Sequence, residues 1–443
     1  MADAVPQEDG RGASPRALLS WCLYDWANSA FPTVITTFVF AAYFTRAVAA
    51  DEVAGTSQWG AAMSLSGLAI ALAGPVLGAI ADRGGRRKPW IAAFTALCVA
   101  LTALLWFARP DPSFALYTLV LVASANFAFE MGGVFYNAML PGLAAEGRLG
   151  RLSGWAWGVG YAGGLACLVV ALVGFVQAEN PLFGLDRDAA EHVRATAPLV
   201  ALWFALFSLP LFLWTPDVPA TGVGLIEAAR RGVATLAGTL RRVGEYRMVA
   251  RFLLAHMIYA DGLNTLFAFG GIYAAGTFGM EFADIIVFGI GLNVTAGLGA
   301  ALFAWADDAV GPKRTILVAV AGLAGFGAVL VLIDSVTLFW IFGLGLGVFV
   351  GPAQAASRSF MARLAPPHLR AEMFGLYALA GKATAFVGPA LLAWVTAASG
   401  SQRWGMATIL GFFVIGGLLL LAVEEPANRR DPANPQGSLG AFP

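Results

Sequence analysis

Two short stretches of this chain, GAIADRGGRRKPW at residues 78–90 and WADDAVGPKRT at residues 305–315, repeat one pattern of polar residues. Aligned on an aspartate, they read Asp82-x-x-Gly85-Arg86-Arg87-Lys88 and Asp308-x-x-Gly311-Pro312-Lys313-Arg314. Each stretch lies between two long apolar runs, at the same place in its half of the chain. The sequence therefore contains an internal duplication, and we expect a fold made of two related halves.

The composition around these stretches is that of a membrane protein. Of 443 residues, 59% are hydrophobic and 12% are charged, whereas soluble domains carry about 25% charged residues. The mean hydropathy is +0.74. In lipid, every backbone polar group must be satisfied by helices or by a closed barrel. The apolar runs are continuous and lack the alternation of barrel strands, so we predict an all-α membrane protein.

Apolar runs of about 20 residues or more can cross a bilayer as helices. We therefore expect twelve transmembrane helices in two pseudo-symmetric six-helix bundles, with spans near 18–44, 57–81, 90–108, 114–141, 152–177, 197–215, 251–278, 282–306, 315–333, 336–362, 372–398 and 404–423. The predicted division is a tail at 1–17, a first bundle at 18–215, a linker at 216–250, a second bundle at 251–423 and a tail at 424–443.

The linker differs in kind from the spans. Within IEAARRGVATLAGTLRRVGEYR, residues 226–247, apolar side chains recur at helical spacing beside pairs of arginines: Ile226, Val233, Leu236, Leu240 and Val243 beside Arg230, Arg231, Arg241 and Arg242. This pattern predicts a basic amphipathic helix on the membrane surface.

The basic residues also predict the orientation. The loops on the side of both termini hold most of them, whereas the opposite loops hold Arg46, Arg109, Arg187, Arg194 and Arg403. Because cytoplasmic loops carry the excess of Lys and Arg, we expect both termini in the cytoplasm, with the bilayer as a partner. The formal net charge is zero, which argues against a nucleic-acid partner.

A second duplicated pattern, D-x-x-N-[S/T]-x-F, lies inside the first predicted helix of each half. It comprises Asp25, Asn28, Ser29 and Phe31 in one half, and Asp261, Asn264, Thr265 and Phe267 in the other. On a helix, residues i, i+3 and i+4 share one face, so each half carries one polar stripe. A charge at membrane depth costs roughly 2.5 to 3.5 kcal/mol. The stripes are therefore candidates for substrate or proton binding, with a purely structural role as the alternative.

The duplicated loops after the second and eighth helices resemble the signature loop of the major facilitator superfamily. The first helix, YDWANSAFPTVITTFVFAAYF at residues 24–44, resembles that of the fungal vacuolar amino-acid effluxers and their bacterial relatives. The resemblance implies a permease with amino acids as a candidate substrate class. It also implies that the first, fourth, seventh and tenth helices line a central cavity, and that the paired loops hold the cytoplasmic side closed in one state.

Charged residues inside other spans extend the candidate site. Lys382, in LYALAGKATAFVGP at residues 376–389, lies well inside an apolar run. A buried ammonium group finds a carboxylate or loses its proton, so we expect it to pair with Asp261, with a surface-directed side chain as the alternative. Glu130 would share the implied cavity with Asp25 and could carry a proton. Arg358 lies near a helix end, and we expect it to anchor at the surface or, alternatively, to point inward and hold a substrate carboxylate.

The remaining candidates are polar. Gln354 shares a helix face with Arg358. Asp82 can place its carboxylate at the start of another helix, where free N–H groups favour an anion. We expect a gating role for the paired loops, with a role in topology alone as the alternative: Asp82, Gly85, Arg86, Asp308, Gly311 and Lys313.

These observations favour a secondary transporter that works by alternating access, coupled to protons, for a small zwitterionic solute such as an amino acid. A sugar or drug carrier is one alternative, and a non-transporting receptor or assembly factor is another. We expect no enzyme activity, because the sequence lacks the motifs of hydrolases and nucleotide-binding loops. We expect no cofactor or metal, a monomer, and a bacterial inner membrane as the location.

Overall fold

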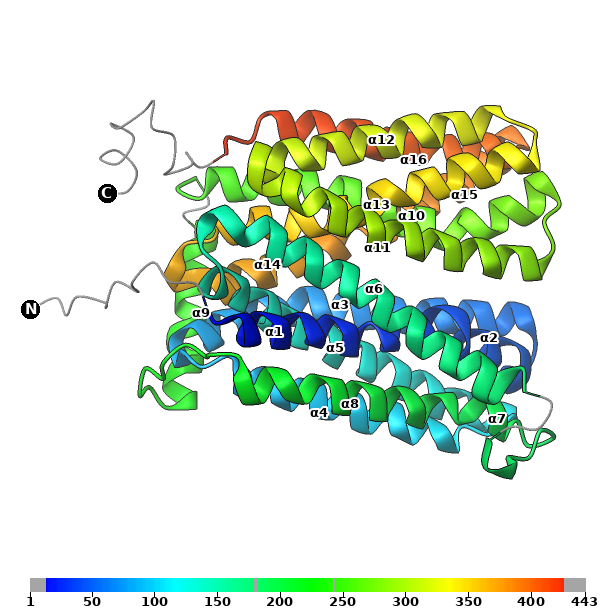
Figure 1. Ribbon diagram of the computed structural model, residues 1–443, viewed down its shortest axis with the longest axis horizontal. Coiled ribbons are helices and arrows are strands. Elements are labelled where there is room, and N and C mark those ends of the chain that lie inside the picture. The colour runs from blue at the N-terminus through cyan, green and yellow to red at the C-terminus, as the bar shows by residue number, and fades with distance from the viewer. Residues whose placement is uncertain (1–12, 179–181, 242–243, 426–443) are drawn as a thin grey trace, which may run out of the picture.

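The computed structural model describes residues 13–178, 182–241 and 244–425, and in these ranges the chain forms helices joined by loops, without strands (Figure 1). Twelve helical spans in this part are long and apolar enough to cross a membrane. Of the predicted tails, residues 1–12 and 426–443 lie outside the described residues, as do residues 242–243 of the predicted linker. The predicted all-α membrane fold with twelve spans is confirmed.

The first half contributes six spans, each within a few residues of its predicted range. Their main helices are α1 (Pro15–Asn28), α3 (Glu52–Gly84), α4 (Lys88–Leu104), α5 (Ala115–Leu143), α6 (Leu149–Ala171) and α8 (Thr196–Trp214). Shorter helical segments extend or join them: η1 (Phe31–Phe38), α2 (Phe40–Tyr43), η2 (Phe44–Val48), η3 (Leu105–Phe107), η4 (Pro112–Phe114), η5 (Glu146–Arg148), η6 (Leu172–Val176), η7 (Leu182–Gly184) and α7 (Glu191–Arg194).

The second half follows α9 (Leu225–Arg241) and repeats the plan of the first. Its helices are α10 (Arg247–Phe278), α11 (Phe282–Val310), α12 (Pro312–Leu332), α13 (Val336–Leu364), η8 (Pro367–Leu369), α14 (Arg370–Ala383), α15 (Val387–Ser399) and α16 (Gln402–Leu421). The first half lies in the lower part of Figure 1 and the second half in the upper part. We call the end at which α1 begins and α16 ends the terminal end, at the left of Figure 1, and the other the far end.

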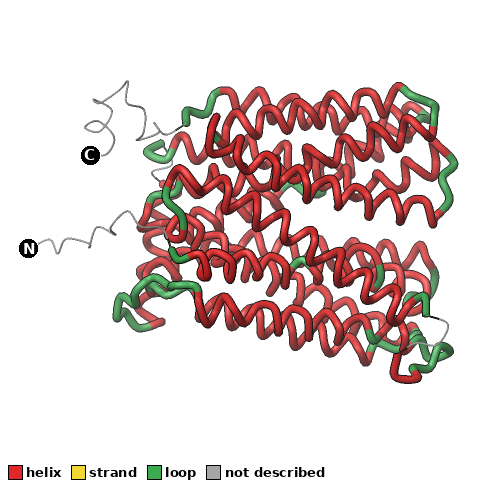
Figure 2. Tube along the Cα trace, in the orientation of Figure 1, coloured by secondary structure: helices red, strands yellow, loops and turns green. Residues whose placement is uncertain are grey.

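Two spans are interrupted in mid-bundle, and both carry candidate site residues. Pro32 has no N–H to offer the carbonyl of Asn28, so the first span leaves the α-helix there and continues as the π-helical η1. The eleventh span, predicted as one helix, is divided into α14 and α15 by a turn at residues 384–386. Figure 2 shows such short interruptions inside the bundle, whereas most loops gather at the two ends. Both irregularities free backbone groups near the centre of the bundle.

The two halves meet through α3 against α14 and through α6 against α11. These are the second span with the eleventh and the fifth with the eighth, so exchanging the halves converts one contact into the other. The approach is close enough to require glycine: a β-carbon on Gly78 would lie 2.2 Å from the carbonyl oxygen of Ala371, and Gly74 meets Gly375 backbone to backbone. Near the terminal end the halves are therefore closed against each other.

The linker contains the predicted amphipathic helix, α9, but one face of it is bound to protein. A β-carbon on Gly232 would lie 2.8 Å from the backbone nitrogen of Ile80 in α3. Arg83 of α3 donates to the hydroxyl of Thr235 at 2.6 and 3.1 Å. Ile226, on the opposite face, is 88% exposed. The helix therefore packs on the terminal end of α3 rather than lying free of the bundle.

Candidate functional site

Asp25 of α1 and Arg358 of α13 form an ion pair between the two halves. Nη1 of Arg358 lies 2.9 Å from Oδ2 of Asp25, and both residues are buried, with 3% and 9% exposure. Arg358 also donates from Nε to the hydroxyl of Ser153 at 2.9 Å and from Nη2 to the Ser153 carbonyl at 2.7 Å. A third acceptor, Oδ1 of Asn137, lies 3.4 Å from Nη1. The expectation that Arg358 anchors at the surface is therefore wrong.

Aromatic rings complete the surroundings of Arg358. Its guanidinium carbon lies 5.0 Å from the ring centroid of Trp21, 5.5 Å from that of Trp157 and 5.9 Å from that of Tyr136. Rings at such distances attract a cation through their quadrupole. Arg358 was misjudged from its distance to a helix end, whereas acceptors from α1, α5 and α6 converge on it inside the bundle.

Glu130 of α5 and Lys382 of α14 form a second ion pair between the halves. Nζ of Lys382 lies 2.8 Å from Oε1 of Glu130. Their side chains keep 26% and 32% exposure, so this pair reaches accessible space that the first pair does not. The predicted pairing of Lys382 with Asp261 is wrong, because Lys382 finds its carboxylate in the other half.

Asp261 instead binds a helix start within its own half. Its Oδ2 accepts from the backbone N–H of Gly388 at 3.1 Å, in the first turn of α15, where N–H groups have no partner inside the helix. The break after α14 creates this site. Oδ1 of Asp261 has no hydrogen-bond partner among the described residues, and the residue is 2% exposed.

The neighbours of Asp261 hold α10 against the interrupted span. Thr265 donates to the Asp261 carbonyl at 2.8 Å, and a β-carbon on Gly388 would lie 2.1 Å from the Thr265 hydroxyl. Asn264 is exposed and donates from Nδ2 to the Gly381 carbonyl at 3.4 Å. Asp261, Asn264 and Thr265 therefore lie along α14 and α15, and their contacts are with Gly381 and Gly388 rather than with Lys382.

Of the other polar candidates, Gln354 bonds across the interface, whereas Asn28 bonds to the neighbouring Ser29. Oη of Tyr161 in α6 donates to Oε1 of Gln354 in α13 at 2.7 Å, which is another polar contact between the halves. Asn28 is buried, and its Oδ1 accepts from the Ser29 hydroxyl at 3.5 Å. Sequence reasoning did not single out Ser153 or Asn137 as partners of Arg358, since a lone serine or asparagine in an apolar span carries no distinctive signal.

The aspartates of the duplicated loops each bind the first turn of a helix in the opposite half. Asp82 accepts from the N–H groups of Ala371 at 3.0 Å and Glu372 at 2.8 Å, at the start of α14. Asp308 accepts from the N–H groups of Gly150 at 2.8 Å and Arg151 at 3.2 Å, at the start of α6. Helix N-termini favour anions, so both loops join the halves by the same chemistry.

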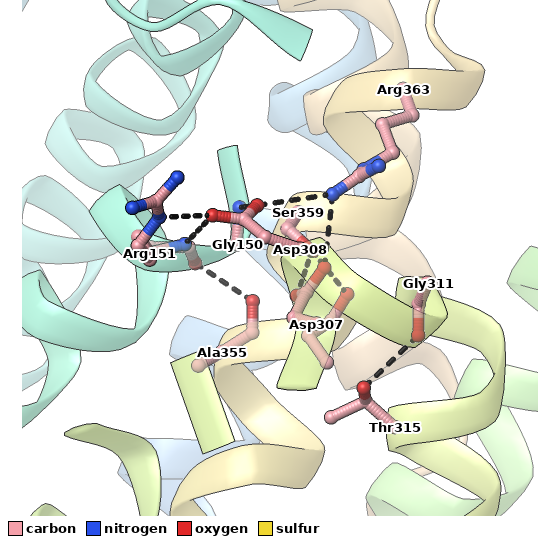
Figure 3. A network of polar contacts seen from close by, with 11 residues as sticks. Gly150, Arg151, Asp307, Asp308, Gly311, Thr315, Ala355, Ser359 and Arg363 are labelled. Atoms are coloured by element: carbon pink, nitrogen blue, oxygen red, sulfur yellow. Dashed lines mark hydrogen bonds and ion pairs between the residues drawn. The ribbon is translucent and has the colours of Figure 1, made fainter. Parts of the chain in front are cut away.

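The second loop carries an additional polar network, shown in Figure 3. Nε of Arg151 lies 2.8 Å from Oδ2 of Asp308, and Nη2 of Arg363 lies 3.1 Å from Asp307 and 3.5 Å from Asp308. Ser359 also donates to Asp307. Asp307 and Arg363 were not predicted, although the Asp307–Asp308 pair in the sequence could have indicated a second carboxylate here.

The basic residues of the duplicated loops differ in burial and in hydrogen-bond partners. Arg87 is buried beside Asp82, with Nη2 and Oδ1 3.6 Å apart. Burial lowers the pKa of the Arg87 guanidinium, and the carboxylates of Asp82 and Asp217 oppose that effect. Arg86 is exposed, and Lys313 donates to the Leu421 carbonyl at 2.9 Å. Arg87 therefore lies inside the protein rather than at its surface.

The two loop glycines adopt backbone conformations that other residues rarely reach. Gly85 has φ +85° and Gly311 has φ +92°. Each follows the last turn of a long helix and lets the chain turn into the next span. The positive φ angle therefore explains why the duplicated pattern has glycine at both places.

Comparison with known proteins identifies the family to which this chain is similar. The family model described as vacuole effluxer Atg22 like matches residues 46–149 and 145–433. The uncharacterised MFS-type transporter YxiO of Bacillus subtilis is 28% identical over 412 residues, which cover 92% of this chain and 94% of YxiO. Autophagy-related protein 22 of Coccidioides immitis is 24% identical over 434 residues, with 80% of this chain and 70% of the relative covered.

Solved structures show the same fold. The human organic anion transporter MFSD10 matches with a TM-score of 0.70 at 14% identity, covering 94% of this chain and 100% of that structure. The major facilitator transporter FucP in the outward conformation matches with a TM-score of 0.70 at 15% identity, covering 93% and 98%. At such identities the likeness concerns the arrangement of the helices.

Proposed function

This chain belongs to the Atg22-like family of vacuole effluxers within the major facilitator superfamily, and on that premise we propose that it moves an amino acid or a similar zwitterion across the membrane, coupled to protons. The observation that carries the proposal is the Glu130–Lys382 pair, which joins the two halves and keeps part of both side chains exposed. A carboxylate and an ammonium group at one place match the two charges of a zwitterion.

The proposed binding step exchanges one ion pair for two. The substrate ammonium group would bind Glu130 and the substrate carboxylate would bind Lys382, so that neither charge is left without a partner in a place where isolated charges are costly. A solute with a single charge would satisfy one residue and strand the other. Asn264 and Gln354, near the same interface, are the polar groups that we propose contact the rest of the solute.

Alternating access follows from which contacts join the halves. We propose that the terminal end faces the cytoplasm, as the basic loops predict, and that the contacts of Asp82 and Asp308 hold it closed. Opening it requires α3 to leave α14 and α6 to leave α11. The Asp25–Arg358 pair would part in the same motion, since its members belong to different halves.

Proton coupling would use the carboxylates of this region. When Asp25 loses Arg358, it becomes a free carboxylate near the middle of the bundle and can take up a proton. Asp261, one of whose oxygens has no hydrogen-bond partner in the described part of the chain, is a second proposed proton site. Protonation of either carboxylate would remove an unpaired charge inside the membrane, which otherwise opposes the movement of the two halves.

The test is thermal stability of the purified protein with a panel of amino acids, sugars and cationic drugs. A ligand that binds the folded state raises stability by about 2.7 kcal/mol at a hundred times its dissociation constant. We expect amino acids to stabilise the wild type and to lose this effect in Glu130→Gln and Lys382→Met. The matched control is Glu227→Gln, which alters a half-exposed pair on α9.

The two alternatives predict other results. Stabilisation by sugars or drugs, with none by amino acids, would point to a carrier of another class. A protein that no solute stabilises, and whose Asp25→Asn and Asp261→Asn variants keep the phenotype of the wild type, would be a receptor or an assembly factor.

A further inference from the structure

We infer that Glu372 is a proton-binding site: it is neutral while the terminal end is closed and ionises when that end opens. Glu372 lies in the first turn of α14, beside the contact of α14 with α3, and is 0% exposed. It was not among the residues that the sequence singled out. The inference rests on the alternating-access cycle proposed above, because it needs an open state that exposes the side chain.

The carboxyl group of Glu372 has no partner that suits an anion. Neither Oε1 nor Oε2 accepts a hydrogen bond from the described residues. The backbone N–H of the same residue is already used, since it donates to Asp82 at 2.8 Å. A buried carboxylate without donors is strongly disfavoured, whereas the neutral acid carries no uncompensated charge. The closed state therefore selects the protonated form.

Burial is the main reason for a protonated acid, and the charged neighbours of the group act in opposite directions. The charged groups that act on the Glu372 carboxyl are Asp82 and Arg83, both of α3. The negative charge of Asp82, which the buried Arg87 faces at 3.6 Å, opposes a second carboxylate. The positive charge of Arg83 acts in the other direction, although its hydrogen bonds go to the Thr235 hydroxyl. From α10, the titratable His256 stacks on Tyr377, further along α14, with ring centroids 4.2 Å apart.

The third neighbour, Thr239 of α9, offers a hydroxyl that can accept the proton of a carboxylic acid. Its hydroxyl is buried next to Glu372 and donates its proton to the Thr235 carbonyl at 3.2 Å. The lone pairs of that hydroxyl are then available to a carboxylic acid, which has one O–H to donate. The linker helix thus places an acceptor for the acid proton beside Glu372.

Opening the terminal end removes the conditions that keep Glu372 neutral. The side chain is covered because Gly78 and Gly74 bring α3 against the start of α14. Once α3 withdraws, water can solvate the carboxylate and the proton leaves. By linkage, the closed state binds one more proton than the open state, so a rise in pH on this side favours opening by up to about tenfold per pH unit.

The experiment measures the closed-to-open ratio of the full chain in lipid nanodiscs as a function of pH. Spin labels at Arg148→Cys and Arg314→Cys, two exposed positions at the terminal ends of opposite halves, report the distance between the halves. The native cysteines, Cys22, Cys98 and Cys167, are buried. We expect the closed fraction of the wild type to fall as pH rises from 5 to 9, with the slope of one proton.

The variant Glu372→Gln mimics the neutral acid. We expect it to stay closed over the whole pH range, while the control Glu227→Gln follows the wild type. A flat profile in the wild type, or an unchanged slope in Glu372→Gln, overturns the inference. If Glu372→Gln does not fold, Glu372→Asp is measured instead. We expect its closed fraction to depend on pH with the same slope as the wild type but with a shifted midpoint. An unshifted midpoint overturns the inference.

The outcomes separate this inference from the proposed function. Distances that respond to amino acids but not to pH refute the proton site and leave the transporter proposal standing. Distances that respond to pH through Glu372, in a protein that binds no amino acid, refute the substrate proposal and leave the proton site standing.

Discussion

The two aspartates of the duplicated loops make the same contact, whereas the two aspartates of the duplicated first helices do not. Asp82 and Asp308 each bind two N–H groups at the start of a helix in the opposite half. Asp25 binds Arg358 across the interface, but Asp261 binds Gly388 within its own half. The terminal end thus keeps the symmetry of the duplication, and the centre of the bundle has lost it.

This difference has a physical reason. Closing one end of two related bundles is a symmetric task, and a carboxylate at a helix N-terminus performs it at either side of the interface. The zwitterion that we propose as the substrate carries two unlike charges, which a carboxylate in one half and a cation in the other would match. Glu130 and Lys382 are the two residues that we propose for this role.

The largest effect expected from this comparison is at Asp25. Asp25→Asn leaves the buried Arg358 without its counter-charge, and breaking such a pair costs about 3–5 kcal/mol. Asp261→Asn keeps an acceptor for Gly388, so we expect a loss of about 1 kcal/mol. Unfolding of the two purified variants under matched conditions measures the difference. Equal losses of unfolding free energy in the two variants would show that Asp25 and Asp261 have equivalent roles in their halves.

A second variant addresses how tightly the terminal end is closed. Gly78→Ala places a β-carbon 2.2 Å from the Ala371 carbonyl oxygen, and such overpacking costs typically about 1–3 kcal/mol. Because only the closed state bears this cost, we expect the spin-label distance at the terminal end to lengthen. Gly84→Ala is the control, since nothing lies within 4 Å of its β-carbon. An unchanged distance in Gly78→Ala would contradict the proposed separation of α3 from α14.

Removing either loop aspartate should have a smaller effect in the same direction. Asp82→Ala and Asp308→Ala each abolish a helix cap, worth about 0.5–2 kcal/mol, and both should shift the protein toward the open terminal end. Each variant also takes a partner from an arginine in its own half, Arg87 or Arg363. Asp308→Ala should have the larger effect on opening, because it also breaks the ion pair with Arg151 of the opposite half. If the spin-label distance at the terminal end lengthened in one variant and shortened in the other, the two aspartates would not have equivalent roles.

The smallest expected effect on stability is at the Glu130–Lys382 pair. Both side chains are partly exposed, and solvent-screened pairs contribute about 0–1 kcal/mol. Glu130→Gln and Lys382→Met should therefore unfold almost like the wild type while losing amino-acid binding. A stability loss as large as that of Asp25→Asn would make this pair a structural element rather than a binding site.

The fold could be predicted almost completely from the sequence, because lipid demands long apolar helices and leaves few other solutions. The twelve spans agree with the structure to within a few residues. The interruption at residues 384–386 was missed, since the apolar run around LYALAGKATAFVGP, broken only by Lys382 and Thr384, is long enough for one helix. That break decides the partner of Asp261, by exposing the N–H of Gly388.

The site could be predicted only as a set of residues. Depth along a span indicated that Lys382 needs a carboxylate, but three candidates lay at similar depth, and the choice depends on how each helix is rotated. The structure turns α14 toward Glu130. The prediction for Arg358 was wrong for a related reason. The distance of a residue from a helix end does not indicate the helix face on which its side chain lies.

The central claim, that Glu130 and Lys382 bind a zwitterion for proton-coupled transport, is tested most directly in proteoliposomes that contain a pH-sensitive dye. Adding an amino acid should produce a proton flux with the wild type and with Glu227→Gln, and none with Glu130→Gln or Lys382→Met. A flux that persists in both site variants, or that sugars evoke and amino acids do not, would contradict the claim.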